Sequence, residues 1–354
     1  MTINFLLPGV ATTPVGGVKV VLGYANKLVQ EGHAVNIIYP VKISMKKMVN
    51  PSLLTRISVT KKIITKRIKK KDTAASWFAL NPAVSELLVP SLLSKYIPDA
   101  DITFATAWQT ANWLNDYPAS KGKKMYLIQH FEDWSGTKEE VEATWKMPLY
   151  KIVIARWLKE YANSIGETAH IVNNGLDFDY LGIITPIEKR NPFRLMMMSH
   201  HLAWKGTADG LTAVKSVKEK FPQLSLILFG VDDAPKDLPD WIEYHQNPKD
   251  IKKLYNDASI FLSTSWAEGW ALPPAEAMQC GCAVIATEIG GHSDYGINGK
   301  DLLLAPVKDP CGFAAVIISL LENNQLRIQI AKSGNQTIQK YTWDAAYQNL
   351  KLHF

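Results

Sequence analysis

Short apolar runs alternate with helical stretches along the first half of the chain. Such runs are typical of buried strands, and the longer stretch Gly17–Gln30 has the period of a helix. The predicted strands are Ile3–Leu7, Ala34–Tyr39, Asp101–Thr106 and Lys124–Gln129. Because the alternation leaves room for helical crossovers, it predicts a parallel, doubly wound α/β sheet.

The same alternation begins again after a break near the middle of the chain. Helical patterns occur at Gly206–Lys220 and Pro248–Asp257. The predicted strands of this second set are Phe193–Met198, Leu224–Phe229, Trp241–His245, Ala258–Ser263, Ala283–Ala286 and Asp301–Leu304. Two similar α/β domains in series are therefore predicted.

The break falls at Asp177–Pro192, where the periodicity lapses and glycine, proline and asparagine cluster. A chain of 354 residues also exceeds what a single hydrophobic core usually supports. We therefore expect a first domain at residues 1–180 and a second at residues 181–341.

Composition describes an ordinary globular protein, with 47% hydrophobic and 20% charged residues. No apolar run approaches the ~20 residues that cross a bilayer, and the first residues lack the pattern of a signal peptide. The three cysteines match neither a disulfide framework nor a metal site. These features predict a cytoplasmic protein.

One segment departs from this composition. Residues 41–71 contain eleven Lys or Arg and no Asp or Glu, although the net charge of the whole chain is only +6. Isoleucines interleave with the charges, as in segments that dock on anionic membranes. Lys42–Lys71 is therefore predicted to make peripheral contact with the inner face of the cytoplasmic membrane. The alternative is a solvated insertion whose lysines keep a loop soluble.

The most informative motif is S-W-A-E-G-W-A-L-P-P-A-E-A at residues 265–277, which places Glu268 and Glu276 eight positions apart. An apolar strand precedes it, and Pro273 with the good helix formers after it predicts a helix start. Open α/β sheets bind ligands at such strand-to-helix junctions, where backbone N–H groups meet phosphate. Two carboxylates beside an anion suit hydroxyl-rich groups such as a sugar and a ribose. A nucleotide sugar contains both of these groups.

This string resembles the Glu-x7-Glu signature of family 4 glycosyltransferases, which are retaining enzymes of the GT-B fold. The resemblance implies two Rossmann-like domains facing across a cleft, with a last helix near residues 342–354 crossing back to the first domain. It implies a nucleotide-diphosphate sugar as donor, and a saccharide or lipid-linked saccharide as acceptor. Segments at residues 98–109 and 126–134 look like members that act in bacterial surface polysaccharide assembly, including rhamnan synthesis.

The resemblance also assigns donor-binding residues in the second domain. Lys205 matches a lysine that reaches the diphosphate, but His200 stands where the family usually has arginine. Glu276 would accept hydrogen bonds from the ribose, and Glu268 would lie near the donor sugar and its reacting carbon. Backbone N–H groups from Gly269, Trp270, Ala271 and Leu272 would face the sugar or the phosphates.

Further candidates lie in the first domain. Gly16 and Gly17 follow the first predicted strand, where the family's backbone approaches the donor; a plain glycine turn is the alternative. His130 follows another predicted strand and corresponds to a histidine near the donor sugar, although a structural histidine is equally compatible with the sequence. Possible acceptor contacts come next in the chain: Glu132, Asp133 and Trp134.

Retaining members of the family need no protein base, because the departing phosphate takes the proton. Catalysis would then come from positioning and charge stabilisation by Glu268, His130 and Lys205. The resemblance implies no metal and no other cofactor. Asp99-Ala-Asp101 mimics a metal-binding motif of the other glycosyltransferase fold, but it precedes a predicted strand and is interpreted as a loop.

Three other functions are alternatives for this sequence. Another GT-B enzyme, such as a nucleotide-sugar epimerase, would share the donor site. A nucleic-acid-binding protein would explain the basic segment, but no recognition module accompanies it, so no nucleic-acid partner is expected. A nicotinamide-dependent dehydrogenase would require Gly-x-Gly-x-x-Gly after the first strand, and the sequence lacks it there.

Overall fold

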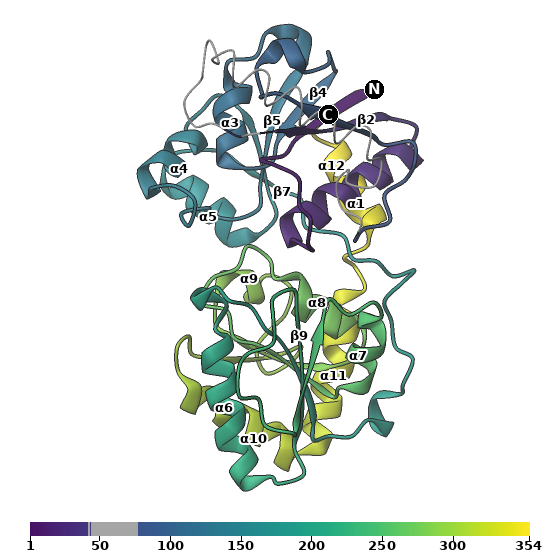
Figure 1. Ribbon diagram of the computed structural model, residues 1–354, viewed down its shortest axis with the longest axis vertical. Coiled ribbons are helices and arrows are strands. Elements are labelled where there is room, and N and C mark those ends of the chain that lie inside the picture. Colours follow the sequence, from purple (N-terminus) through teal and green to yellow (C-terminus); the bar gives the residue numbers. More distant parts are fainter. Residues whose placement is uncertain (42, 44–76) are drawn as a thin grey trace. The chain divides into compact units, whose positions relative to one another are not determined.

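The computed structural model describes residues 1–41, 43 and 77–354. The segment predicted to contact a membrane therefore lies, except for Ile43, outside the described residues. The chain divides into two compact units, the first formed by Met1–Gly175 with Trp343–Phe354 and the second by Leu176–Thr342 (Figure 1). Among the described helices, none is long and apolar enough to cross a membrane.

A seven-stranded parallel sheet forms the centre of the first unit, in the order β3-β2-β1-β4-β5-β6-β7. Its inner strands are largely apolar and buried because helices cover a parallel sheet on both faces, whereas the edge strands β3 and β7 are mostly half-buried. The strands are β1 (Thr2–Leu6), β2 (Ala34–Pro40), β3 (Ser85–Val89), β4 (Ile102–Ala105), β5 (Lys123–Ile128), β6 (Tyr150–Val153) and β7 (His170–Ile171).

The helices of this unit are α1 (Gly16–Gln30), α3 (Trp108–Asn115), α4 (Lys138–Trp145), α5 (Arg156–Ser164) and α12 (Trp343–Lys351). Single 3-10 turns occur at η1 (Ser94–Tyr96) and η2 (Ala119–Lys121). Helix α4 begins with a capping box, in which the Thr137 hydroxyl accepts from the Glu140 N–H and the Glu140 carboxylate accepts from the Thr137 N–H.

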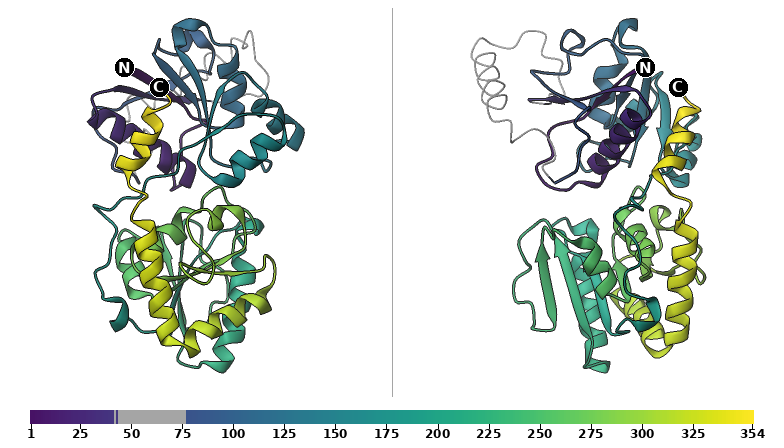
Figure 2. Two further views of the ribbon diagram at one scale, coloured as in Figure 1. Left: turned by 180° about the vertical axis from the view of Figure 1, so that it is seen from behind. Right: turned by 90° about the vertical axis from the view of Figure 1, so that its right-hand side faces the viewer.

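Helix α12 confirms that the last helix returns to the first unit, where it packs beside α1 (Figure 2). Trp343 lies directly over two glycines: a Cβ on Gly23 would come within 2.1 Å of its ring, and one on Gly175 within 2.5 Å. The same ring meets Tyr24 edge to face, with ring centroids 5.3 Å apart. The indole therefore needs both glycines in order to seat against the first unit.

The second unit contains a six-stranded parallel sheet in the order β10-β9-β8-β11-β12-β13. The strands are β8 (Arg194–Met198), β9 (Ser225–Gly230), β10 (Ile242–Gln246), β11 (Ile260–Ser263), β12 (Ala283–Thr287) and β13 (Leu303–Ala305). The helices are α6 (Thr207–Lys220), α7 (Ile251–Asp257), α8 (Leu272–Gln279), α9 (Gly290–Ser293), α10 (Pro310–Glu322) and α11 (Asn324–Ile338), with 3-10 turns η3 (Ile187–Lys189) and η4 (Ala203–Lys205).

The strand order of the second sheet reverses between β8 and β11, which pair in parallel with Ile260 beside Leu195. From β8 the chain proceeds outward to β9 and β10, and from β11 it proceeds to β12 and β13 on the other side. The loops that leave β8 and β11 therefore separate at the carboxyl ends of these strands, which is the usual ligand position in open α/β sheets.

Candidate functional site

The two loops at this reversal point are joined by direct hydrogen bonds. The Trp266 N–H donates to the Trp204 carbonyl at 2.7 Å, and the Thr264 hydroxyl donates to the Lys205 carbonyl at 3.4 Å. The indole N–H of Trp266 donates to Asp209 in the first turn of α6 at 2.7 Å. These contacts hold the loop after β8 against the loop after β11.

Gly206 permits this close approach. Its φ of +68° is left-handed, and a Cβ there would lie 1.9 Å from the Thr264 carbonyl oxygen. Any other residue would both strain its own backbone and collide with the end of β11. Gly206 thus fixes the loop that carries the preceding residue, Lys205.

Lys205 and Glu268, predicted to bind different parts of the donor, are in direct contact. The Lys205 Nζ lies 2.6 Å from Glu268 Oε1, and the two side chains are only 15% and 13% exposed. The Ser265 hydroxyl donates to the same carboxylate oxygen at 2.7 Å. Together with Thr264 and Pro273, these three residues line a small pocket at the carboxyl end of β11.

The loop from Glu268 to Leu272 is held by its neighbours on both sides. Gly291 approaches so closely that a Cβ there would lie 2.6 Å from the Glu268 carbonyl oxygen. Trp270 is buried and meets Tyr295 and Tyr341 with ring centroids 4.9 and 5.2 Å away. The Trp270 side chain therefore packs in the core, while a ligand contact by its backbone stays a prediction.

Ala271 precedes α8 with a left-handed backbone, at φ +46° and ψ 85°. For a residue with a Cβ this conformation costs about 1–2 kcal/mol. Gly269, Ala271 and Leu272 follow Glu268 and lead into α8, which begins at Leu272. Pro273 and Pro274 come next and carry no N–H, so any anion-binding N–H groups of this loop precede them. A contact between these backbone groups and an anion stays a prediction.

Glu276 lies one turn into α8 and is 7% exposed. Its Oε2 accepts a hydrogen bond from the Tyr255 hydroxyl at 3.1 Å. Burial, reinforced by the nearby carboxylate, raises the pKa of Tyr255 well above its usual value, so the phenol keeps the proton it donates. This contact could not be predicted from the residue pattern, because Tyr255 lies in a different helix, α7.

His292 is a buried residue of this region to which the sequence assigned no role. Its Nδ1 lies 2.7 Å from the Thr287 carbonyl, and its Nε2 lies 2.9 Å from the Ser263 hydroxyl. Since a carbonyl only accepts, Nδ1 carries the proton and Nε2 accepts from the serine. Burial lowers the pKa of His292, which favours this neutral form. The ring thus joins the ends of β11 and β12.

His200, at the place of the family's arginine, is half-buried. Burial, followed by the charges of His201 and Lys205, lowers the pKa of its ring. The Leu202 N–H donates to its Nδ1 at 3.1 Å, and its backbone N–H donates to the Thr207 hydroxyl at 2.9 Å. A neutral imidazole here cannot supply the charged fork of an arginine.

In the first unit, Gly16 and Gly17 form the first residues of α1. The Gln129 side-chain amide donates to the Gly17 carbonyl at 3.0 Å. This hydrogen bond connects the start of α1 to the residue that precedes His130, just after the end of β5. Whether either glycine contacts a ligand stays a prediction.

Residues 130–134, which follow β5, lie in three different environments. The His130 ring is enclosed by Trp134 and Trp157, with ring centroids 4.6 and 5.8 Å away. Glu132 accepts from the Trp108 N–H at the start of α3 at 2.9 Å, and burial raises its pKa to about 7. Asp133 is exposed, and so is Trp134 at 52%. Acceptor roles for these residues stay predictions.

Both carboxylates of Asp99-Ala-Asp101, which mimics a metal-binding motif, contact other residues of the first unit. Asp99 forms an ion pair with Lys121 at 2.7 Å, and Asp101 accepts from the Thr2 N–H at 2.7 Å. Both lie in the loop before β4, as the sequence indicated.

A comparison with protein families identifies the domain in which most of these residues lie. Residues 185–337 match the family Glycosyl transferases group 1. The match includes Lys205, Glu268, Glu276 and the whole β8–β11 reversal. The group 1 domain thus accounts for most of the second unit.

Curated relatives match over part of their length. A phosphatidyl-myo-inositol mannosyltransferase of Mycolicibacterium smegmatis is 24% identical over 200 residues, which is 53% of this chain and 51% of the relative. An N,N'-diacetylbacillosaminyl-diphospho-undecaprenol alpha-1,3-N-acetylgalactosaminyltransferase of Campylobacter jejuni is 30% identical over 113 residues, 32% of this chain and 30% of the relative. The chain therefore spans about half or less of the length of these relatives.

The whole chain is similar to solved structures. HepE of Anabaena, solved with UDP-glucose, superposes with a TM-score of 0.74 at 15% identity, covering 100% of this chain and 99% of HepE. The likeness shows the GT-B fold, in which each of two units contains a parallel α/β sheet, and confirms the predicted fold class.

Proposed function

We propose that this protein is a retaining glycosyltransferase that moves a sugar from a nucleoside-diphosphate donor to a hydroxyl of a saccharide or lipid-linked saccharide. The observation that carries the proposal is the Lys205–Glu268–Ser265 cluster at the β8–β11 reversal point, inside the group 1 domain. A lysine, a carboxylate and a helix start in one pocket provide groups for the diphosphate and for sugar hydroxyls.

The donor would rearrange this cluster. A diphosphate brings negative charge that competes with Glu268 for the Lys205 ammonium, and the positive end of the α8 dipole favours that charge. Glu268, released from the lysine, would then accept hydrogen bonds from the donor sugar. Glu276, steadied by Tyr255, would accept from the ribose hydroxyls. The binding energy of the donor thereby prepares the carboxylate for the reacting sugar.

In this proposal the departing phosphate accepts the proton of the acceptor hydroxyl, so the chemistry requires neither a protein base nor a metal ion. Lys205 lowers the barrier because it lies where negative charge grows on the leaving diphosphate. His200 contributes hydrogen bonding rather than charge. His130 in the first unit is proposed to contact the donor sugar.

A lipid-linked acceptor is supported by two relatives. The names of the Mycolicibacterium and Campylobacter proteins each include a lipid, phosphatidylinositol in one and a diphospho-undecaprenol in the other. The basic sequence Lys42–Lys71 would bring the enzyme to anionic lipid at the inner face of the cytoplasmic membrane. A role in bacterial surface polysaccharide synthesis follows from this combination and belongs to the proposal.

The first experiment is a thermal-shift panel of UDP, GDP, dTDP and ADP on the full chain. The cognate nucleotide should raise the unfolding midpoint, because a ligand at 100 times its Kd adds about 2.7 kcal/mol. UDP is the first candidate, since HepE was solved with it. Lys205→Met should abolish the shift. No shift with any of the four nucleotides would contradict the donor site.

A second assay separates transfer from a nucleotide-sugar epimerase, the alternative with the same donor site. The chain is incubated with the cognate nucleotide sugar, with and without a lipid extract that contains polyprenyl-diphosphate saccharides. A transferase releases nucleoside diphosphate and labels the lipid only when acceptor is present. Conversion of the nucleotide sugar without any acceptor would favour the epimerase.

A further inference from the structure

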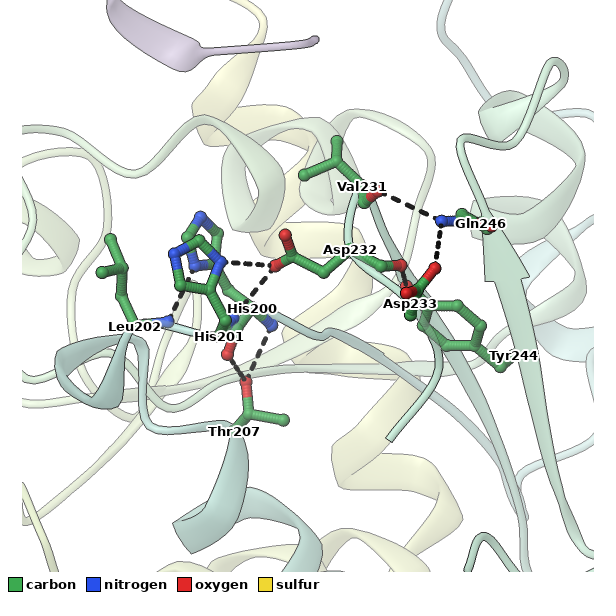
Figure 3. Close-up of polar contacts among 9 residues, drawn as sticks. All are labelled: His200, His201, Leu202, Thr207, Val231, Asp232, Asp233, Tyr244 and Gln246. Carbon is green, nitrogen blue, oxygen red and sulfur yellow. Dashed lines mark hydrogen bonds and ion pairs between the residues drawn. The ribbon is translucent and has the colours of Figure 1, made fainter. Parts of the chain in front are cut away.

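A cluster of two histidines and one aspartate lies beside the loop that carries Lys205. His200 and His201 come from the loop after β8, and Asp232 comes from the loop after β9 (Figure 3). One possible ligand atom from each of the three lies within 4.8 Å of the others. The proposed transfer reaction assigns no role to His201 or Asp232.

The sheet topology brings these residues together. β8 and β9 are neighbouring parallel strands, so the loops at their carboxyl ends emerge side by side. The Ser199 N–H donates to the Phe229 carbonyl at 2.7 Å, which extends the pairing by one residue. Gly230 allows the contact, because a Cβ there would lie 2.4 Å from the Ser199 carbonyl oxygen.

Surrounding groups fix the backbone on both sides of the cluster. The Thr207 hydroxyl accepts from the His200 N–H at 2.9 Å and donates to the His200 carbonyl at 3.0 Å. The Tyr244 hydroxyl donates to the Asp232 carbonyl, and the Gln246 amide donates to the Asp233 carboxylate at 3.3 Å (Figure 3). The three side chains therefore project from anchored main chain rather than from a free loop.

The donor set has the chemistry of a transition-metal site. Two imidazoles and one carboxylate suit Zn²⁺ and related divalent ions, and three protein ligands leave a position for water or another ligand. Mg²⁺ and Ca²⁺ prefer sites built from oxygen ligands. We propose that His200, His201 and Asp232 bind one Zn²⁺-class divalent ion.

Binding needs only side-chain adjustment. Bonds of about 2.0–2.2 Å in a tetrahedron place the donors roughly 3.4 Å apart. His201 Nδ1 and Asp232 Oδ2 are now 2.8 Å apart in a hydrogen bond that the ion would replace. The His201 side chain is 64% exposed and can turn freely, whereas His200 must give up the Leu202 N–H. An affinity in the micromolar range is expected for a site with this cost and partial exposure.

The ion would be separate from the transfer chemistry. It would share His200 with the proposed donor site, whereas His201 and Asp232 have no role in the proposed reaction. Metal binding is measured without nucleotide, so its outcome does not depend on the proposed function. Failure of the nucleotide panel would leave this inference intact, and failure of metal binding would leave the glycosyltransferase proposal intact.

The test is Zn²⁺ titration of the tag-free full chain in competition with a chromophoric chelator, followed by the visible spectrum of the Co²⁺ complex. We expect one equivalent of ion and a Co²⁺ spectrum of nitrogen and oxygen ligands. His201→Asn and Asp232→Asn should each weaken binding at least ten-fold. Thermal unfolding midpoints near wild type would show that both variants still fold.

A matched control is His245→Asn. His245 also lies beside a carboxylate, 3.6 Å from Glu243, but it belongs to no three-ligand group among the described residues. This variant should bind Zn²⁺ like the wild type. Binding that persists in both His201→Asn and Asp232→Asn, or a thiolate-to-cobalt charge-transfer band that places the ion on cysteine, would overturn the proposal.

Discussion

The ammonium of Lys205 lies 2.6 Å from the carboxylate of Glu268, although 63 residues separate the two in sequence. Family resemblance gives them different partners, the lysine a diphosphate and the glutamate a sugar. In the structure each neutralises the other. The pairing keeps either charge from being buried without a partner, which would be costly.

Removing one member of this pair should destabilise the second unit. We expect Lys205→Met and Glu268→Gln each to lower the free energy of unfolding by roughly 1–3 kcal/mol, because the remaining group loses its partner. The double variant should recover part of the loss, with a coupling energy of about 1 kcal/mol in a double-mutant cycle. Urea denaturation gives the free energy of unfolding of the wild type, the two single variants and the double variant.

The exposed pair of Lys220 and Glu322 serves as the control for that cycle. Its two side chains are 55% and 53% exposed, so Lys220→Met should cost less than about 1 kcal/mol. Nucleotide binding should be lost in Lys205→Met and in the double variant but kept in Lys220→Met. Strict additivity of the Lys205 and Glu268 effects would show that the ion pair contributes nothing.

Glu276 should discriminate ribose from deoxyribose. We expect Glu276→Gln to weaken binding of the cognate nucleotide about ten-fold or more, about 1.4 kcal/mol, while binding of its 2′-deoxy analogue changes little. Tyr255→Phe, which removes only the donor to Glu276, should have a smaller effect in the same direction. Isothermal titration with both nucleotides provides the comparison, and equal losses for the two would refute a ribose contact.

Glu132 should make stability fall as pH rises from about 4.5 to about 7. Its folded pKa of about 7 lies above the ordinary value of 4.5. In that window the unfolded chain releases a proton that the folded chain retains, so ionisation favours unfolding. Glu132→Gln cannot ionise and still offers an oxygen to the Trp108 N–H. Its unfolding midpoint relative to wild type should therefore be higher at pH 8 than at pH 4.5, by the equivalent of about 1–2 kcal/mol. A pH-independent difference would contradict this.

Gly206→Ala should cost far more than a left-handed glycine ordinarily does. The new Cβ would meet the Thr264 carbonyl, so the loop carrying Lys205 must shift and nucleotide affinity must fall with stability. Gly299→Ala is the matched control: its φ is +77°, yet nothing lies within 4 Å of the added Cβ. The control should lose about 1 kcal/mol of stability and no nucleotide affinity. Thermal unfolding and nucleotide titration are measured for both variants. If Gly206→Ala and Gly299→Ala lost similar amounts of stability and affinity, the loop would accommodate the added Cβ at little cost, contrary to this prediction.

Strands were predictable where an unbroken apolar run marks a strand buried on both faces. All six strands of the second sheet were predicted to within two residues or so. In the first sheet β3, β6 and β7 were not predicted. In β6, Lys151 interrupts the apolar pattern. The lysine is buried, and its ammonium is satisfied by Glu167 at 2.9 Å and by the Met147 carbonyl at 2.9 Å. A sequence shows the charge but not the partners that make its burial tolerable.

The site was predictable in its parts rather than in its contacts. Spacing and the strand-to-helix pattern predicted the loop that carries Glu268 and the helix that carries Glu276. Their partners Lys205 and Tyr255, and the nearby His292, come from other elements, and the positions of these three depend on which strands are neighbours. Local pattern does not determine that order, so the ion pair, the phenol contact and the buried imidazole appear only in the folded chain.

The packing of Trp343 over Gly23 and Gly175 also affects when the first unit can complete its folding during synthesis. The ribosome produces the residues of the first sheet early, yet the indole that fills the space above these two glycines emerges only after all of Leu176–Thr342 has been made. The part of α1 that Trp343 covers therefore stays uncovered until α12 has been synthesised.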